Sequence, residues 1–371
     1  MFTESGCRYI YPQITDLAEL ISRNGHKVVI LAPYDPDVVK WNAGRGFDFA
    51  YFRPTFPRLS RTQNLQYILR SLAEIYKSDV VISFSTPTLV TGLIAATLFQ
   101  KQSIYYSLEL SVPGEANFEL YSLFQKLLRY TDLKIFSTGP HRSEVMHSAY
   151  SLSNTPGSIS CAALSKTSTT ISSEKGWIPF RLRELAKTQN GITVVCDGGL
   201  SPINCFDMLL EAKIPVSSGV IIGMIGPLDS SIKPLLDLTR KETDNYFYLG
   251  ELAGTRYDII NALRGTTLGI AFKRADNFSI QNDQLYTPNK LYDYFAAGVP
   301  ALCSSQASLR FVAEDCLGYI LSDLSATSLA NFLTSLPNRT MELEKMAALI
   351  TRRFQTDLNF ETAAAPLLDL I

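Results

Sequence analysis

The chain has 371 residues, of which 46% are hydrophobic and 19% are charged, and its formal net charge is −1. This length exceeds what one compact core usually supports, so two domains of ordinary size are expected. The nearly neutral charge provides no basic field of the kind that nucleic-acid-binding proteins carry. We therefore expect no nucleic-acid partner and look for local binding sites instead.

The cysteines and histidines indicate neither a zinc site nor a disulfide framework. They lack Cys-x-x-Cys and Cys/His metal spacing, and several cysteines lie in apolar, strand-like runs. We expect reduced, buried thiols in a cytoplasmic protein, and no metal or cofactor. The six cysteines are Cys7, Cys161, Cys196, Cys205, Cys303 and Cys316.

No membrane-spanning segment is predicted. The first eight residues lack the apolar core of a signal peptide. The most apolar long run, residues 80–99, is interrupted by Ser, Thr and Pro, so it favours a strand, a turn and a helix over a membrane span. A peripheral membrane contact, and with it a membrane-associated cytoplasmic protein, stays open as an alternative.

The first half of the chain alternates between helical and strand-like patterns, which argues for βαβ units and a parallel sheet. The pattern ends at residues 150–175, which are rich in Ser, Thr, Asn, Pro and Gly, as is typical of an interdomain linker. Residues 159–164 could form one more strand as an alternative. In chain order we expect helix 16–24, strands 27–31 and 47–52, helix 62–76, strand 79–85, helix 87–99, strand 103–110, helix 118–130, strand 133–138 and helix 142–149.

The start of the chain is unusual for such a domain. Doubly wound domains open with a strand that is usually central in the sheet, whereas Met1 is followed at once by FTESG, which resembles the loop after such a strand. Losing a central strand would leave neighbouring backbone groups unpaired. We therefore expect a shortened chain start.

The alternation restarts in the second half. In chain order we expect strand 192–196, helix 202–212, strand 219–225, helix 232–241, strand 246–249, helix 255–263, strand 268–272, helix 288–297, strand 300–304, helix 309–315, strand 318–321 and helix 326–336. Two apolar helical segments follow, and they need a surface to cover. We expect domains at 1–165 and 176–340, with 341–371 packing back on the first.

Residues 287–298, TPNKLYDYFAAG, are the strongest candidate for a ligand site. Thr287 is a plausible N-cap and Pro288 a plausible first helical residue. Lys290 then lies in the first turn, where the macrodipole disfavours a cation, and Asp293 lies on the same face. Backbone N–H groups and an ammonium suit a phosphate, and a carboxylate suits sugar hydroxyls, so the segment predicts a nucleotide site. An ordinary amphipathic helix with a solvated Lys290 is the alternative.

Three glycine-containing turns follow expected strands, where ligands of a doubly wound sheet collect. The first, residues 197–202, offers Gly198, Gly199 and Ser201 as a second phosphate-facing turn. Gly226 and Gly250 end the next two strands and leave room beside a base or ribose. Structural tightness explains these glycines equally well.

Further candidates lie in polar loops. Lys273, Arg274, Asn282 and Asp283 precede the 287–298 segment and suit donor sugar or phosphate contacts, with a solvated loop as the alternative. Glu109 falls in an apolar strand, where burial of an unpaired carboxylate is costly.

The second half, especially TPNKLYDYFAAGVPALCSS and the later GYIL, resembles the nucleotide-sugar domain of GT-B glycosyltransferases, in particular glycosyltransferase family 4. The first half, with DLAELISRNGHKVVILAP, is similar to that family's acceptor-side domain. The resemblance covers almost the whole chain. It implies two Rossmann-like, doubly wound α/β domains facing a cleft, and a nucleotide diphosphate sugar held mainly by the second.

The resemblance also implies site residues. Asp293 matches the family's glutamate that bonds the ribose, Lys290 lies near the phosphates, and these two with Glu109 are the expected catalytic residues. Gly6, Arg8 and Tyr9 are expected on the acceptor side. The donor nucleotide is expected to contact Gly198, Gly199, Ser201, Gly226, Gly250, Pro288, Asn289, Lys290, Leu291 and Asp293.

This sequence departs from the family pattern at three places. Gly199 and Asn204 stand where the family carries an arginine and a lysine, Leu285 replaces the first glutamate of a paired motif, and the usual acceptor-domain histidine is absent. Two hypotheses follow. One is a glycosyltransferase that moves a sugar from a nucleotide donor to a glycan or lipid-linked acceptor with retention, and the other is a weak or inactive relative that binds nucleotide or glycan. A nucleotide-sugar epimerase of the same fold is a third.

Overall fold

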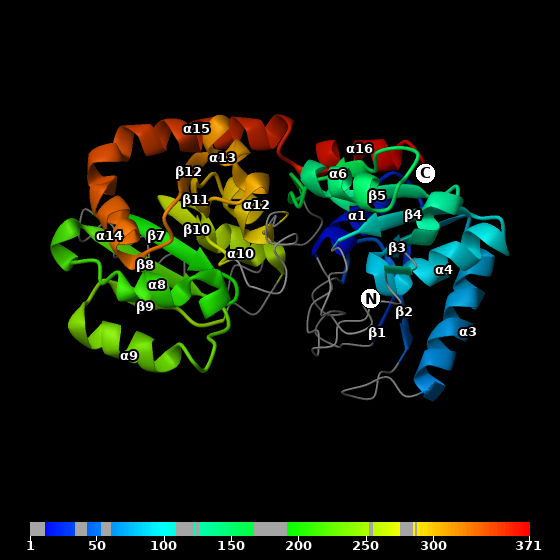
Figure 1. Ribbon diagram of the computed structural model, residues 1–371, viewed down its shortest axis with the longest axis horizontal. Helices are drawn as coiled ribbons and strands as arrows, with labels where there is room; N and C mark the ends of the chain where they lie inside the picture. The colour runs from blue at the N-terminus through cyan, green and yellow to red at the C-terminus, as the bar shows by residue number, and fades with distance from the viewer. Residues whose placement is uncertain are drawn as a thin grey trace. The chain divides into compact units, whose positions relative to one another are not determined.

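The computed structural model describes residues 12–33, 43–52, 61–108, 122–123, 126–166, 191–251, 255–274, 285 and 288–371. The chain forms two compact units (Figure 1). The first unit contains Met1–Thr169 and Phe360–Ile371, and the second contains Thr170–Asn359. In both units parallel strands alternate with helices, which confirms the predicted α/β class with two Rossmann-like domains.

The second unit is built on a parallel sheet with the strand order β12-β11-β10-β7-β8-β9. From β7 the chain builds outward through β8 to β9 and then returns to the other side of β7 with β10. The strand order therefore reverses between β7 and β10, and ligands of open α/β sheets bind at such a switch point. Its strands are β7 (Ile192–Asp197), β8 (Val220–Ile225), β9 (Tyr246–Tyr248), β10 (Leu268–Ala271), β11 (Ala301–Ser304) and β12 (Gly318–Leu321).

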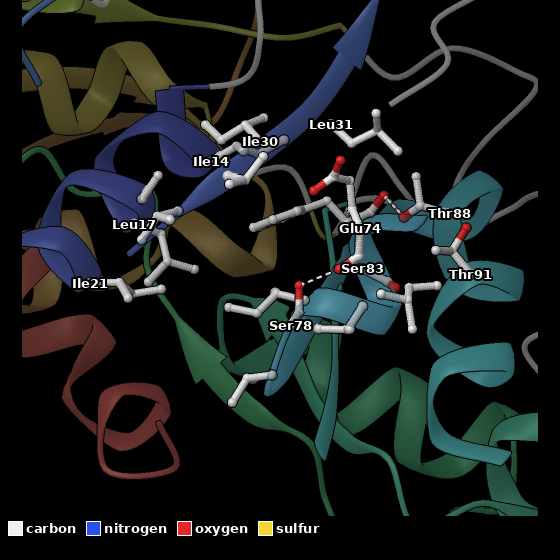
Figure 2. Close-up of a pocket in the computed structure, with 18 of the residues that line it drawn as sticks. Ile14, Leu17, Ile21, Ile30, Leu31, Glu74, Ser78, Ser83, Thr88 and Thr91 are labelled. Carbon is white, nitrogen blue, oxygen red and sulfur yellow. Dashed lines mark hydrogen bonds between the residues drawn. The ribbon is translucent and has the colours of Figure 1, made fainter. Parts of the chain in front are cut away.

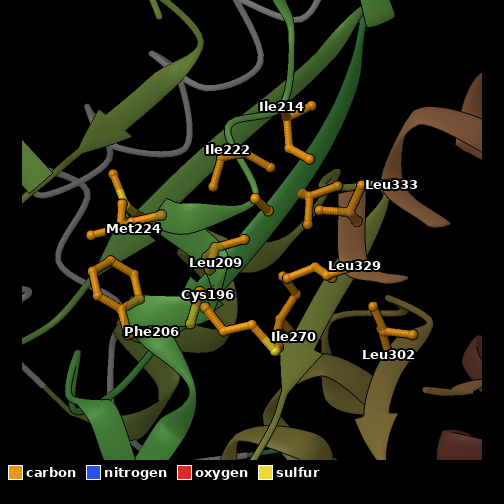
Figure 3. Close-up of a cluster of buried hydrophobic side chains, with 14 of the residues drawn as sticks. Cys196, Phe206, Leu209, Ile214, Ile222, Met224, Ile270, Leu302, Leu329 and Leu333 are labelled. Carbon is orange, nitrogen blue, oxygen red and sulfur yellow. The ribbon is translucent and has the colours of Figure 1, made fainter. Parts of the chain in front are cut away.

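Two groups of helices pack within this unit. Helix α8 contacts α9 and α14, whereas α12 contacts α10 and α15. Figure 3 shows strand side chains such as Cys196 and Ile222 packed with Leu209 of α8 and Leu333 of α14. The helices are α8 (Phe206–Glu211), α9 (Lys233–Glu242), α10 (Arg256–Leu263), α12 (Asn289–Ala296), α13 (Phe311–Glu314), α14 (Ala326–Ser335) and α15 (Thr340–Thr356).

Three local predictions for the second half were wrong. The expected helix 202–212 is broken at Cys205, whose φ of 56° is left-handed, into a 3-10 turn (Pro202–Asn204) and α8. Pro288, expected to be the first helical residue, has extended φ and ψ angles and is the N-cap of α12. Cys316 is exposed, whereas the other cysteines among the described residues are buried as expected.

The first unit contains two parallel sheets in the described part of the chain, β1-β2 and β3-β4-β5-β6. Its strands are β1 (Val29–Pro33), β2 (Asp48–Phe52), β3 (Val80–Phe84), β4 (Gln102–Ser107), β5 (Lys134–Thr138) and β6 (Gly157–Ile159). Its helices are α1 (Pro12–Arg23), α3 (Arg61–Lys77), α4 (Ser85–Thr97), α6 (Pro140–Ala149) and α16 (Phe360–Leu368). The alternative strand at 159–164 is present only as β6, which ends at Ile159.

The carboxyl-terminal helices belong to different units. Helix α16 contacts β6 and α1, and the Phe360 N–H donates to the Ala163 carbonyl at 2.9 Å. The Glu361 carboxylate accepts two hydrogen bonds from the Ser165 backbone N–H, at 2.9 and 3.1 Å. Helix α15, in contrast, lies in the second unit, so the division between the units falls inside the segment 341–371. None of the helices in the described ranges is long and apolar enough to cross a membrane.

Candidate functional site

The side chain of Tyr294, in the second half of α12, joins this helix to the switch point of the second sheet. Its hydroxyl donates to the Ile270 carbonyl of β10 at 3.0 Å and accepts from the Asp197 N–H of β7 at 3.3 Å. Gly269 makes room for the ring, because a Cβ atom there would lie 2.5 Å from ring carbons of Tyr294. Helix α12 is thereby joined to the two strands between which the strand order reverses.

Lys290, in the first turn of α12, lies beside a buried carboxylate. Asp197 ends β7 and is only 3% exposed, and Lys290 is 9% exposed. Burial raises the pKa of Asp197, and the nearby positive charge of Lys290 is the largest effect that opposes this rise. Within the described residues, Asp197 Oδ1 has no hydrogen-bond partner. The ammonium of Lys290 thus favours the ionised form of a carboxyl group whose burial disfavours it.

The charge of the same ammonium also acts on three thiols. Burial raises the pKa of Cys196 and of Cys205 to about 11, and burial also raises the pKa of Cys303. In each case the charge of Lys290 opposes the rise. These thiols are therefore protonated at neutral pH and act as apolar packing groups around the lysine.

Asp293 is paired with an arginine that the sequence did not reveal. The Nε atom of Arg256 lies 2.5 Å from Asp293 Oδ1, and the two side chains are 5% and 8% exposed. Arg256 is the first residue of α10, whose start is fixed by a capping box between Thr255 and Asp258. The carboxylate expected at the ribose is thus already held by a protein cation.

The turns after β7, β8 and β9 approach one another through glycines with positive φ. Gly198, Gly226 and Gly250 have φ angles of 88°, 131° and 83°. The Gly226 N–H donates to the Gly250 carbonyl at 2.9 Å, and a Cβ atom on Gly226 would lie 2.1 Å from the Gly198 carbonyl oxygen. Gly226 therefore permits close contact between neighbouring turns, whereas Gly198 has open space around its α-carbon.

The turn after β7 is held together by its own side chains. The Asn204 amide donates to the Gly199 carbonyl at 2.7 Å and to Ser201 Oγ at 3.3 Å. The Leu200 N–H donates to the Pro227 carbonyl of the next turn at 2.9 Å. Asn204, which stands at a position where a lysine was expected by resemblance, thus has a structural role in the turn.

The loop after β10 is tied to both neighbouring turns. Arg274 forms a two-pronged ion pair with Asp207, at 3.0 and 3.1 Å, and its N–H donates to the Ile203 carbonyl at 2.7 Å. The Lys273 N–H donates to Ser304 Oγ at the end of β11, at 3.1 Å. Arg274 is therefore a surface contact to α8, and the start of the loop is rigidly positioned.

Most predicted donor residues lie on the carboxyl edge of this one sheet. Leu291 is fully buried. The residues that lie there are Gly198, Gly199, Ser201, Gly226, Gly250, Lys273, Arg274, Pro288, Asn289, Lys290, Leu291 and Asp293. Six predicted site residues lie outside the described residues: Gly6, Arg8, Tyr9, Glu109, Asn282 and Asp283.

Sequence reasoning missed Asp197, Arg256 and Tyr294. Asp197 ends an otherwise apolar strand, and Arg256 is a cation in the first turn of a helix, like Lys290, so both carried a signal. The role of Tyr294 depends on contacts between distant strands and carried none. No cluster of three or more metal-ligating side chains is present in the part of the chain that the structure describes.

Solved structures share this architecture at low sequence identity. HepE (Alr3699) of Anabaena in complex with UDP-glucose has a TM-score of 0.72 and 12% identity, with 96% of this chain and 94% of that chain covered. WaaG, a glycosyltransferase involved in lipopolysaccharide biosynthesis, has a TM-score of 0.65 and 12% identity, with coverage of 97% and 95%. Sucrose-phosphate synthase from Thermosynechococcus elongatus has a TM-score of 0.63 and 14% identity, with coverage of 95% and 90%.

No protein-family model and no curated protein sequence matches the chain. At these identities the likeness concerns the fold alone, but it extends over nearly the full length of both partners in each comparison. The parallel sheets of the two units, and the reversal of strand order in the second, agree with it. The chain therefore has the GT-B fold of glycosyltransferases.

Proposed function

We propose that this protein is a glycosyltransferase that uses a nucleotide diphosphate sugar as donor. The observation that carries the proposal is that Tyr294 joins α12 to β7 and β10 at the switch point of the second sheet, and that Lys290 lies in the first turn of the same helix. Backbone N–H groups of the first helical turn and the Lys290 ammonium together suit a diphosphate.

The other proposed donor contacts lie at the same edge of the sheet. Asp293 is the proposed ribose contact and would share its carboxylate between Arg256 and the sugar hydroxyls. The turns at Gly226 and Gly250 offer backbone with little side-chain bulk beside the base. The chemistry requires stabilisation of the departing diphosphate and placement of an acceptor hydroxyl, and it requires no nucleophilic side chain.

We further propose that transfer proceeds with retention, as in glycosyltransferase family 4, and that the acceptor is a glycan or a lipid-linked sugar. The support is the sequence resemblance around residues 287–298, together with the fold. HepE, which shares the fold, has been crystallised with UDP and with UDP-glucose, and this supports a nucleotide sugar as the ligand class.

A second function is favoured by the charge pairing at the site. Arg256 pairs with Asp293, Arg274 pairs with Asp207, and Lys290 stabilises Asp197. A diphosphate must therefore compete with internal carboxylates for its cations. This favours a weak catalyst, or a protein that binds nucleotide or glycan without transfer.

A donor panel separates these functions. The full chain is incubated with UDP-, GDP-, ADP- and TDP-sugars, with and without a mixture of glycan and lipid-linked acceptors, and nucleotide release is measured. Binding of each nucleotide is measured in parallel by calorimetry. We expect release with one donor class that increases when acceptor is added.

Each other result has a definite meaning. Binding without release from any donor would favour the non-catalytic function. Conversion of the donor sugar into an isomer without release would indicate an epimerase. If the protein neither binds any nucleotide nor releases one from any donor, the assignment of the α12 start as a nucleotide site is contradicted.

A further inference from the structure

Two buried side chains after β11 hold the backbone just beyond the end of the neighbouring strand β10. The Lys273 N–H donates to Ser304 Oγ at 3.1 Å, and the side-chain amide of Gln306 donates to the Lys273 carbonyl at 2.9 Å. Ser304 Oγ in turn donates to Gln306 Oε1 at 2.5 Å, which closes a ring of three hydrogen bonds. We call this ring the 273–306 clamp.

The 273–306 clamp continues the contact between the two strands past the end of their pairing. The register of β10 and β11 ends at Ala271 and Cys303, so Lys273 lies beyond the last paired residue. Ser304 is fully buried, and Gln306 is 6% exposed and is the N-cap of the 3-10 turn that follows β11. Fixed side chains therefore satisfy both backbone polar groups of Lys273, for which a surface loop would use water.

Hydroxyl side chains around the cavity of the first unit bond differently. Figure 2 shows Ser78 and Thr88 there, and their hydroxyls donate to the carbonyls of Glu74 and Phe84 at 2.7 and 2.6 Å. Each acceptor lies four residues earlier in the chain, which is an ordinary local bond of Ser and Thr. Ser304 bonds instead to a backbone group 31 positions away. Its hydrogen bonds therefore position a second element.

The residue after Lys273 is held from the opposite side. The Arg274 N–H donates to the Ile203 carbonyl at 2.7 Å, in the turn after β7, and the Arg274 guanidinium pairs with Asp207 of α8. The main chain of Lys273 and Arg274 is thus fixed between the turns after β7 and β11. A fixed main chain restricts where the half-buried Lys273 side chain can reach, which is how supporting contacts orient a ligand-binding group.

The strand order places Lys273 next to the proposed diphosphate. The proposed base contacts follow β8 and β9, and the proposed phosphate contact, Lys290, lies in α12, which is joined to β7 and β10. In the order β9-β8-β7-β10-β11 the turns after β10 and β11 come next. Neighbouring strands lie about 4.8 Å apart, a distance comparable with the width of a sugar ring. A nucleotide sugar that runs along this edge from its base would bring its sugar to the 273–306 clamp.

We propose that Ser304 and Gln306 are positioning residues that hold Lys273 against the sugar of the donor. The inference rests on the proposed function, because it requires a nucleotide sugar that binds along this edge of the sheet. An ammonium has three donors and no acceptor, so Lys273 suits the oxygen atoms of sugar hydroxyls. The base and the ribose have their proposed contacts elsewhere, so loss of the clamp should impair recognition of the sugar selectively.

The test compares a nucleotide sugar with the nucleotide alone. Gln306→Met nearly keeps the side-chain volume and removes both clamp hydrogen bonds of Gln306. Calorimetry is performed with the UDP-, GDP-, ADP- and TDP-sugars of the donor panel and with UDP, GDP, ADP and TDP. For the nucleotide sugar that the unchanged protein binds, we expect Gln306→Met to weaken binding about fivefold and to change binding of the matching diphosphate less than about twofold.

Ser218→Ala is the matched control for Ser304→Ala. The Ser218 hydroxyl donates to the Pro215 carbonyl at 2.6 Å and accepts from the Val220 N–H at 3.2 Å, so it also has two hydrogen bonds. Ser218 directly precedes β8 and therefore lies at the opposite edge of the sheet. Ser304→Ala should weaken binding of the nucleotide sugar selectively, and Ser218→Ala should leave it unchanged.

Lys273→Met identifies the route of the effect. If the clamp acts through this lysine, adding Gln306→Met to Lys273→Met should cause no further loss of affinity for the nucleotide sugar. Additive losses would overturn the proposal. Equal weakening of nucleotide-sugar and diphosphate binding by Gln306→Met would also overturn it, because a general disturbance of the site would explain that result.

Hydrogen exchange without nucleotide distinguishes failure of this proposal from failure of the proposed function. The Lys273 amide should exchange at least about tenfold faster in Gln306→Met and Ser304→Ala than in Ser218→Ala, with β8 as the internal reference for folding. An unchanged rate would overturn the clamp alone. If the unchanged protein binds no nucleotide and no nucleotide sugar, the proposed function is overturned, and the role of Lys273 with it.

Discussion

Lys290 combines two features that are each unfavourable alone. It is a cation in the first turn of a helix, and it is almost buried. Asp197 is electrostatically coupled to it, because the charge of Lys290 is the largest effect that opposes the burial-induced rise in the pKa of Asp197. A cation that is costly to place in this position is the proposed contact to the phosphates.

Replacement of Lys290 tests this contact. Lys290→Ala should weaken binding of a nucleoside diphosphate by about 1.5 to 3 kcal/mol, the range for a hydrogen bond to a charged group. The measurement is calorimetry with the nucleotide found in the donor panel. Lys233→Ala is a matched control, because Lys233 is an exposed lysine at the first position of α9. Equal effects of the two substitutions, or unchanged binding in Lys290→Ala, would exclude the phosphate role.

Replacement of Asp197 should change nucleotide affinity in the opposite direction. Asp197→Asn removes a carboxyl group whose ionised form would compete for Lys290, so nucleoside diphosphate should bind roughly tenfold more tightly. Calorimetry on the single variants and on the Asp197→Asn/Lys290→Ala double variant measures the coupling. If Asp197→Asn still tightens binding when Lys290 is absent, the effect does not act through this pair.

The sequence revealed the charged residues of the site better than their partners. Lys290 and Asp293 were identifiable because their spacing from a helix start is local. Asp293 pairs with Arg256, which lies 37 positions away, and the charge of Lys290 acts on Asp197 of a distant strand. Such pairs depend on the order of strands in the sheet, which periodicity does not contain.

At the scale of elements, the turns after the strands determine how closely the backbone can approach a ligand. Gly198 and Gly226 share a positive φ but differ in surroundings. Gly198 requires glycine only for its backbone conformation. Gly226 also requires it because the neighbouring turn fills the space that a side chain would take.

The two glycines therefore form a matched pair for mutagenesis. Gly198→Ala should lower the free energy of unfolding by about 1 to 2 kcal/mol, the cost of a left-handed backbone. Gly226→Ala adds a clash with backbone and should lower it by at least about 2 kcal/mol more. Denaturant unfolding measures both. Equal losses would contradict the packing of one turn on the next.

Element types were predictable because the hydrophobic periods are clear. Every strand expected in residues 192–321 is present, and β12 has the expected bounds, Gly318–Leu321. The break at Cys205 was not predictable, since a non-glycine residue rarely takes a left-handed conformation and the surrounding pattern is helical. The N-cap of α12 was displaced by one residue for a similar reason: Pro288 suits both positions.

At the scale of the whole molecule, the last helix returns to the unit in which the chain begins. Phe360, Ala364 and Leu367 of α16 are fully buried. The hydrogen bond from Phe360 to Ala163 and the contacts of Glu361 with Ser165 fix the start of the helix. The first unit thus depends on residues from both ends of the sequence.

Phe360→Ala tests this dependence. Loss of a fully buried aromatic ring should lower the free energy of unfolding of the first unit by about 3 to 5 kcal/mol. Hydrogen exchange should accelerate in β5 and β6 and stay unchanged in β8 of the second unit. Asp369→Ala, at an exposed position next to α16, is the control. Acceleration in β8 would show that α16 stabilises the second unit instead.

The architecture as a whole was the most predictable level. Alternating strands and helices already indicate parallel sheets, and the resemblance around residues 287–298 indicates the GT-B fold. The order of the strands and the division of 341–371 between the units were not predictable in the same way. Both depend on which apolar faces meet in space. The sequence of two consecutive apolar helices does not indicate that they pack in different units.

The paired charges around α12 also affect how the protein selects ligands. A site whose cations already have counterions inside the protein gains little from an anion as such, because binding exchanges one ionic contact for another. Inorganic phosphate or sulfate should then be poor competitors. Recognition would rest on the shape of the whole ligand and on how well it replaces the carboxylates that it displaces, so we expect this edge of the sheet to discriminate against simple anions that are abundant in any cell.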